Sequence, residues 1–475
     1  MNSRTAIFLF SLAAGCLAVA EEEKAVAKNG DSFDWDLGAD LRVRQEIMDN
    51  IPGHPGDPDC AYPTASGKNL NWIRFRPRVW SRFSTEHADF YLRLANETRE
   101  TIARNGNSRR ECSYSFPDEL VVDNLYLGFR NLFDDQLDIR IGRQDFLDNG
   151  APAFGSGRVM MDGTGYDGSR TLSFDAIRLT WRPTEKQSLD AFAIYNRGDN
   201  QLNLGRPRPY PRPANAFDPR DSDEMDEYGG GLYYRNRELS DDLGFELYYV
   251  YKRETSYHRG GVRHPGRYTN TFGGRLLPRF TETLSGEIEG ALQAGQKETG
   301  ASTAGAMGFA GLTYRPEETI GTAKPFFKAS CYYLSGDKQR TGDNDRDSGW
   351  NPVWARWPQD SEMLVYGPLY GLGYWSNMIF PSAGAGLDIA KHHRVNIYGG
   401  PMFCATQDHL GGGNGSDYQG VLGVARYDFP IWKNPNEGGI GEIFGHILAE
   451  CFQPGDYYAS DRTAYFFRWE IYATF

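Results

Sequence analysis

Residues 33–44, with the sequence FDWDLGADLRVR, alternate between apolar side chains at odd positions and polar residues or glycine at even positions. Residues 71–83 repeat this alternation with arginines on the polar face, and the last thirteen residues, 463–475, repeat it again. Successive side chains of a strand point to opposite faces of a sheet. The pattern therefore predicts strands with one apolar face and one face in contact with water.

The same alternation marks about eighteen segments along the chain. They lie near residues 33–47, 69–83, 88–99, 119–130, 136–144, 169–181, 188–198, 223–236, 242–254, 268–277, 283–296, 301–314, 323–334, 376–390, 393–407, 417–429, 441–453 and 463–475. Short connections such as 84–87, 131–135 and 391–392 mostly alternate with long ones such as 145–168 and 335–375. An even number of strands with short turns at one end and long loops at the other is typical of outer-membrane barrels.

We therefore predict an all-β fold, a transmembrane antiparallel β-barrel of about 18 strands, with short periplasmic turns and long extracellular loops. A soluble sandwich or propeller would also alternate, but many of these segments exceed the roughly five to six residues usual in soluble strands. Tryptophans also gather near segment ends, as interfacial girdles require; they are Trp35, Trp72, Trp181, Trp375 and Trp469.

Composition excludes several other classes of protein. The chain has 475 residues, a net charge of −12 and 14% aromatic residues. Its only sizeable apolar run, residues 6–20, is shorter than the roughly 20 residues of a membrane-spanning helix. The mean hydropathy of −0.59 is compatible with barrel strands, which alternate apolar and polar residues. An acidic chain that is rich in aromatic residues argues against disorder and against nucleic acid as a partner.

The N-terminus predicts export. Arg4 precedes the apolar run, which ends in an Ala-Val-Ala sequence at residues 18–20. This arrangement predicts a signal peptide over residues 1–20, a short periplasmic segment over 21–32, and a barrel over 33–475 in the cell outer membrane. A rival cleavage at Cys16, in a sequence that loosely resembles a lipoprotein box, stays open.

Five cysteines remain after cleavage at residue 20, too few for a disulfide framework. Cys60 and Cys112 lie in loop-like stretches and are candidates for a disulfide, with free thiols as the alternative. Cys331, Cys404 and Cys451 lie in strand-like segments, where we expect free, packed thiols.

If the apolar face meets lipid, the polar face lines a lumen. The predicted pore-lining arginines are Arg42, Arg44, Arg74, Arg76, Arg78, Arg93, Arg140 and Arg178. Guanidinium groups bind carboxylates bidentately and keep their charge at any working pH, so such a set would select anions. The predicted lumen also carries acids, among them Asp40, Glu46, Glu97, Glu246, Glu287 and Glu289. The alternative is that these charges pair across the barrel and only brace it.

Two motifs carry a family resemblance. Residues 139–144, IRIGRQ, are followed by RTLSFDAIRL at 170–179, Arg76-Pro77 lies on the second segment, and PGDY at 454–457 precedes the last. Together they resemble the alginate-export family of outer-membrane porins. The resemblance implies an 18-stranded barrel through which an acidic exopolysaccharide leaves the cell by an arginine-rich constriction.

The same resemblance adds residues to the predicted pore lining. Arg76 matches a constriction arginine, and Arg143 and Gln144 match the family motif. Arg143 has the apolar parity of its strand, so we expect it at a bulge or rim. Asp145 and Asp123 stand where polyuronate exporters can have basic residues. The resulting lumen is less positive, which argues against alginate itself as the substrate.

Trp350, Trp354 and Trp357 lie in the long 335–375 connection. They could stack on sugar rings or pack the loop over the pore mouth. No residue pattern predicts a catalytic triad, a metal site or a cofactor.

The predicted function is an outer-membrane pore that passes an anionic or mixed-charge solute, with an exported acidic polysaccharide as one candidate. Its expected partners are outer-membrane lipid, the solute and periplasmic export components. The first alternative is a non-conducting outer-membrane barrel acting as a glycan-binding adhesin or an enzyme. The second is a secreted soluble β protein.

Overall fold

A computed structural model describes most of the chain. The described residues are 33–50, 69–104, 120–148, 151–159, 173–197, 225–259, 262–338, 346–355, 360–363, 376–389, 392–408, 414–434, 441–459 and 461–475. The predicted signal peptide 1–20, the segment 21–32, Cys60, Cys112, Trp357 and Trp375 lie outside them.

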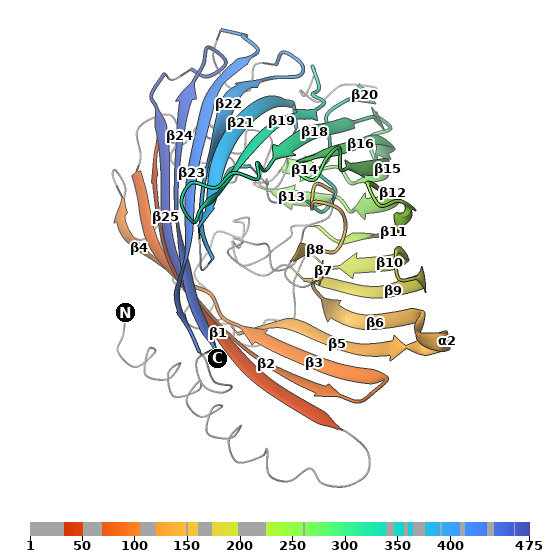
Figure 1. Ribbon diagram of the computed structural model, residues 1–475. Helices are drawn as coiled ribbons and strands as arrows, with labels where there is room; N and C mark the ends of the chain where they lie inside the picture. The colour runs from red at the N-terminus through yellow and green to blue at the C-terminus, as the bar shows by residue number, and fades with distance from the viewer. Residues whose placement is uncertain are drawn as a thin grey trace.

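Eighteen antiparallel strand positions close into a barrel (Figure 1). Strand β1 (Asp34–Asp49) pairs with β2 (Asn69–Ser84) on one side and with the last strand, β25 (Ala464–Thr474), on the other, which closes the ring. The third position holds two strands in tandem, β3 (Ala88–Ala95) and β4 (Thr98–Arg104), and both pair with β2.

The remaining positions follow in chain order. They are β5 (Val121–Asn131), β6 (Leu137–Gln144), β9 (Phe174–Thr184), β10 (Gln187–Asn196), β11 (Glu227–Ser240), β12 (Leu243–Glu254), β15 (Arg267–Pro278), β16 (Leu284–Lys297), β18 (Ala306–Tyr314), β19 (Lys324–Leu334), β21 (Met378–Ile389), β22 (His393–Phe403), β23 (Tyr418–Lys433) and β24 (Glu442–Pro454). Each of the eighteen predicted segments overlaps one position, so the predicted barrel is confirmed.

Short elements lie in the connections between these strands. They are α2 (Leu132–Asp135), β7 (Leu147–Asp148), β8 (Ala151–Pro152), β13 (Tyr257–Arg259), β14 (Val262–His264), β17 (Ser302–Thr303) and β20 (Arg346–Asp347). Among the described residues, no helix has the length and apolarity needed to cross a membrane.

The two faces of the strands differ as the alternation predicts. Outward positions carry exposed apolar side chains, such as Leu292 on β16 at 67% and Ile397 on β22 at 58%. Inward positions carry buried charged side chains, such as Arg44 and Glu46 on β1, both at 0%. Water would disfavour so much exposed apolar surface, whereas hydrocarbon accepts it. The outer face is therefore suited to lipid.

One tryptophan does not fit the predicted girdle. Trp35 and Trp181 are exposed near strand ends, as expected. Trp72 is instead buried and donates its indole N–H to Glu46 inside the barrel at 2.5 Å. Its even position on β2 gives it the inward parity of the neighbouring arginines, so its assignment to the outer girdle was wrong.

The short turns and the C-terminus share one rim. Residues 85–87 join β2 to β3, residues 185–186 join β9 to β10, and the backbones of Phe475 and Ala39 exchange two hydrogen bonds there. In outer-membrane barrels the short turns face the periplasm. We refer to this end as the short-turn rim.

Candidate functional site

Six arginines from three neighbouring strands face the interior and form the arginine wall. They are Arg42 and Arg44 on β1, Arg74, Arg76 and Arg78 on β2, and Arg468 on β25. Strand register brings them together, because Arg42 lies opposite Arg76, and Arg44 lies opposite Arg74. All six are buried, so their charges lie in a confined space away from bulk water.

Glu46 is the centre of the arginine wall. Its carboxylate accepts from Arg468 at 2.5 Å and from Arg74 at 3.0 Å, and Arg44 lies at 3.3 Å. Trp72 donates a further hydrogen bond. Such a fully buried carboxylate is stable only because several charged donors surround it.

Guanidinium groups outnumber the described carboxylates in the arginine wall. Among the described residues, the carboxylates in contact with its arginines are Asp40, Glu46, Glu97 and Glu470, with Glu362 of a later connection as a fifth. Within the described part of the chain, the Nε of buried Arg76 has no hydrogen-bond partner.

The opposite side of the lumen carries an acidic wall, formed by Glu246 on β12 and by Glu287 and Glu289 on β16. Arg275 lies 2.9 Å from Glu287 and 3.3 Å from Glu246, which also contacts Arg237 at 2.5 Å.

Arg158, from the long connection after β6, contacts Glu287 at 2.6 Å and Glu289 at 2.9 Å. Its guanidinium also lies 3.4 Å from the centroid of the Phe309 ring. Among the described residues, the acidic wall has three cations for three carboxylates, and pairing of this kind braces the barrel.

The three other arginines predicted from strand parity also point inward. Arg93 contacts Asp123 at 2.5 Å and Asp145 at 2.7 Å. Those two aspartates, which depart from the family pattern, therefore neutralise an arginine inside the barrel.

Arg178 donates to Asp190 at 2.9 Å, and Arg140 lies over the ring of Tyr126 at 4.6 Å. Arg140 and Arg178 are themselves cross-strand partners.

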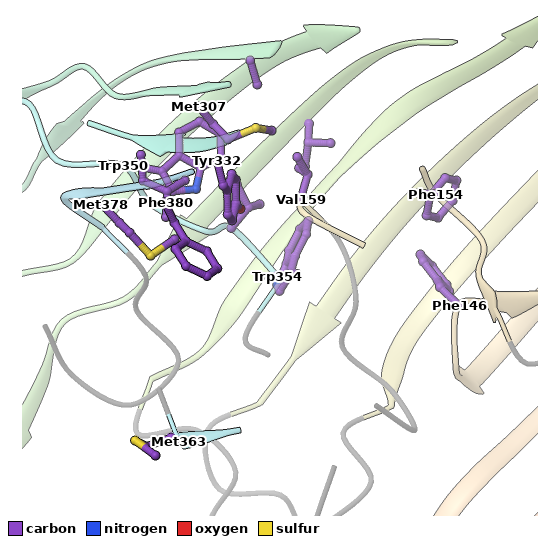
Figure 2. Close-up of a cluster of buried hydrophobic side chains, with 14 of the residues drawn as sticks. Phe146, Phe154, Val159, Met307, Tyr332, Trp350, Trp354, Met363, Met378 and Phe380 are labelled. Atoms are coloured by element: carbon purple, nitrogen blue, oxygen red, sulfur yellow. The ribbon is translucent and has the colours of Figure 1, made fainter. Parts of the chain in front are cut away.

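Two inserted segments fill part of the interior. Figure 2 shows Phe146, Phe154 and Val159 of the first segment and Trp350 and Trp354 of the second in one apolar cluster. The clustering follows from the inward apolar positions of the barrel wall, which offer buried aromatic partners such as Phe192 and Tyr233.

Trp350 and Trp354 are 3% and 0% exposed. The indole N–H of Trp354 donates to Glu227 at 3.1 Å, and the Lys252 ammonium lies 5.5 Å from its ring centroid. Both rings therefore pack the long connection inside the barrel, which is one of the two roles that the sequence left open. Stacking on a sugar would require both rings to leave this cluster.

The same connection then reaches the other side of the lumen, and we call residues 360–363 the strap. Glu450 on β24 accepts from the Ser361 hydroxyl at 2.5 Å and from the backbone N–H groups of Glu362 and Met363 at 2.8 and 2.9 Å. The Glu362 carboxylate lies 2.9 Å from Arg468. The strap thus delivers a fifth carboxylate to the arginine wall.

Asp360 begins the strap. Its backbone carbonyl accepts from the Tyr398 hydroxyl at 2.6 Å. Burial raises the pKa of the Asp360 carboxyl above its ordinary value, and the Arg158 guanidinium opposes this shift.

The sequence and the fold of this chain are both similar to those of known proteins. A family model described as alginate export matches residues 35–382, more than half of the chain. The chain belongs to the alginate-export family. No match to a curated protein was found.

Solved structures also resemble this alginate-export family member. OccAB2 from Acinetobacter baumannii has a TM-score of 0.52 at 9% identity, over 93% of this chain and 98% of that chain. OccAB1 from the same organism has a TM-score of 0.50 at 12% identity, over 95% and 99%. At these identities the similarity is one of fold. Family and fold together establish an outer-membrane barrel of the porin type.

The family motif at the end of β6 has a structural role in this alginate-export family member. Gly142 has φ of 126°, and a Cβ there would collide with the carbonyl oxygen of Leu125. The buried Gln144 amide donates to the carbonyls of Gly142 at 3.2 Å and Ala176 at 3.0 Å. Arg143 keeps its outward parity and lies 3.4 Å from Asp175 on β9.

Sequence reasoning left several interior charges out of the predicted pore lining. Arg468 could have been found, because alternation put it on the polar face of the last strand and barrel closure places that strand beside β1. Arg158 and Glu362 had no such signal, since their positions depend on how long connections fold.

Cys331, Cys404 and Cys451 are free, as predicted. Cys404 is buried, but Cys331 and Cys451 are exposed, so the prediction that these thiols are packed was wrong for those two. Among the described residues, no cluster of histidine, cysteine or acidic side chains could hold a metal ion.

Proposed function

We propose that this outer-membrane barrel is an anion-preferring pore in which the arginine wall selects the solute. The observation that carries the proposal is the concentration of six buried guanidinium groups on three adjacent strands, where Arg42 lies opposite Arg76. The acidic wall, by contrast, has three cations for three carboxylates among the described residues. A low-dielectric barrel focuses the field of the clustered arginines into the aqueous path and raises the local concentration of anions.

The solute class follows from the chemistry of the arginines. Guanidinium groups favour carboxylate and phosphate, which accept two parallel N–H donors. An acidic polysaccharide is the candidate that the family description supports. Arg93 is occupied by Asp123 and Asp145, which lowers the positive charge along the path relative to a wholly basic lumen. We therefore favour an anionic or mixed-charge solute, moved by its own gradient without catalysis.

The test is the swelling of liposomes that contain the purified protein. Neutral, uronate and amino sugars of matched size would be compared, with the Arg42→Gln/Arg76→Gln variant in parallel. The proposal predicts fastest entry for the uronate in the native protein and a reduced advantage in the variant. Equal rates for all three sugars would contradict it.

The alternative of a non-conducting barrel keeps one observation in its favour, the strap that lies inside the barrel against β22, β24 and β25. In that case liposomes would not swell with any sugar, while the protein would bind a glycan saturably.

A further inference from the structure

Arg468 on β25 contacts two carboxylates that come from different parts of the fold. Glu46 on β1 accepts from Nε at 3.0 Å and from Nη2 at 2.5 Å, and the Glu362 carboxylate of the strap lies 2.9 Å from the same Nη2. Glu46 is fully buried and has Arg44 and Arg74 as further partners. The Glu362 side chain is 17% exposed. Glu46 is thus a fixed part of the arginine wall, and Glu362 is the carboxylate on Arg468 that water and solute can reach.

The backbone of the strap is held separately from the Glu362 carboxylate. Glu450 on β24 accepts from the backbone N–H groups of residues 362 and 363 at 2.8 and 2.9 Å, and from the Ser361 hydroxyl at 2.5 Å. None of these three hydrogen bonds uses the Glu362 carboxylate. That carboxylate can therefore turn away from Arg468 while the backbone of the strap stays on Glu450.

Bracing of the barrel does not explain the second carboxylate on Arg468. Glu46 already links β1 to β25 through Arg468, and it lies directly opposite Arg468 in the strand register. Glu362 belongs to a connection, so its contact joins no further pair of strands. A second negative charge at the same nitrogen also adds repulsion between the two carboxylates.

Glu362 presents to the arginine wall the same chemical group that an acidic sugar carries. Both are carboxylates, which accept charge-assisted hydrogen bonds from guanidinium groups. Because Glu450 keeps the backbone of Glu362 close to Arg468, the tethered carboxylate has a high effective concentration there. A free carboxylate that reaches Arg468 must compete with it.

We propose that Arg468 is a carboxylate subsite of the solute path, and that Glu362 is its built-in occupant, which the carboxylate of an acidic sugar displaces. Glu450 is a positioning residue, because it holds the strap where the Glu362 carboxylate returns to Arg468 after the sugar leaves. The inference rests on the proposed pore function and deepens it. A neutral sugar has no group that replaces Glu362, so the exchange favours uronates beyond the general attraction of the arginine wall.

The experiment is block of the channel current in planar bilayers by trigalacturonate, with maltotriose as the neutral trisaccharide. Glu362→Gln removes the competing carboxylate. We expect it to bind trigalacturonate at least about tenfold more tightly than the native protein, because no charge-assisted contact has to be broken first. Maltotriose should affect both proteins equally.

Glu362→Asp separates competition from a general charge effect. It keeps the negative charge but shortens the side chain by one methylene, which withdraws the carboxylate from Arg468. Competition predicts that trigalacturonate binds this variant more tightly than the native protein. Native affinity in Glu362→Asp, with a gain in Glu362→Gln alone, would show a charge effect and would overturn the proposal.

Glu450→Gln tests the positioning role. Its amide offers one acceptor oxygen in place of two, so the tether should loosen and trigalacturonate should bind more tightly. In the Glu362→Gln background the same change should add nothing, because Glu450 acts through Glu362. An equal effect of Glu450→Gln in both backgrounds would overturn its positioning role.

Glu298→Gln is the matched control, since it removes a carboxylate that is paired with the exposed Arg263. A gain in this control equal to that of Glu362→Gln would overturn the proposal. Equal block of the native protein and both Glu362 variants would also overturn it, while an anion-preferring pore would stand. A channel without anion preference whose block still strengthens in Glu362→Asp would contradict the proposed function alone. If the protein does not conduct, calorimetric titration of trigalacturonate into the detergent-solubilised proteins tests the subsite, and equal affinities would overturn it.

Discussion

Arg42 on β1 and Arg76 on β2 are direct cross-strand partners inside the barrel. Both side chains are buried, at 2% and 6% exposure. Like charges directly opposite each other on neighbouring strands destabilise a sheet. Stability of the barrel therefore does not account for this pair, whereas the proposed attraction of an anion into the lumen would.

Removal of one of the two charges should relieve this repulsion. We expect Arg76→Gln to leave the free energy of unfolding unchanged or to increase it by up to about 1 kcal/mol. Denaturant unfolding in detergent measures this. Arg275→Gln is the control, because it removes one of three cations from the balanced acidic wall and should destabilise the barrel. Equal destabilisation by both variants would show that Arg76 has a bracing role.

Glu46 should be the most sensitive carboxylate of the arginine wall. Glu46→Gln leaves Arg44, Arg74 and Arg468 without their shared counter-charge, and breaking a buried ion pair costs about 3–5 kcal/mol. The same unfolding measurement checks the loss. Glu442→Gln at the short-turn rim, where Glu442 is paired with the exposed Lys433, should cost less than about 1 kcal/mol. A small effect of Glu46→Gln would mean that the other carboxylates of the arginine wall, Glu97, Glu362 and Glu470, compensate for its loss.

Gly142 tests the structural role of the family motif. Gly142→Ala forces a Cβ into the carbonyl of Leu125 at a positive φ, which should destabilise the barrel by about 1–3 kcal/mol. Gly308→Ala is the control, since a Cβ there meets only the Tyr333 side chain at 3.9 Å. Heat-induced loss of β-structure by circular dichroism would compare the two variants, and equal melting temperatures would contradict the strain argument.

The strap should lower the anion preference of the pore. Glu362→Gln removes the negative charge of the carboxylate that contacts Arg468. We expect a larger anion-to-cation permeability ratio in this variant, measured in bilayers. Glu298→Gln, which removes a carboxylate paired with the exposed Arg263, should leave the ratio unchanged. A lower ratio in Glu362→Gln would show that the strap does not compete with the solute.

The strands could be predicted from sequence because lipid on one face and charge on the other impose a period of two at every position. That period also placed Arg74 and Arg178 inside the barrel. The assignment of Trp72 to the girdle was wrong, because that assignment used the preference of tryptophan for membrane interfaces, whereas the period of two places Trp72 on the inward face.

The interior filling could not be predicted from the same pattern. Arg158 and Trp354 occupy positions set by long connections that have no periodicity.

The reversal potential across a bilayer with a potassium chloride gradient tests the central role of the arginine wall most directly. The native protein should give a potential of the sign set by chloride permeation. In Arg42→Gln/Arg76→Gln the potential should move toward zero or toward the cation-selective sign, because two positive charges of the arginine wall are lost. An unchanged reversal potential in the double variant would contradict the account.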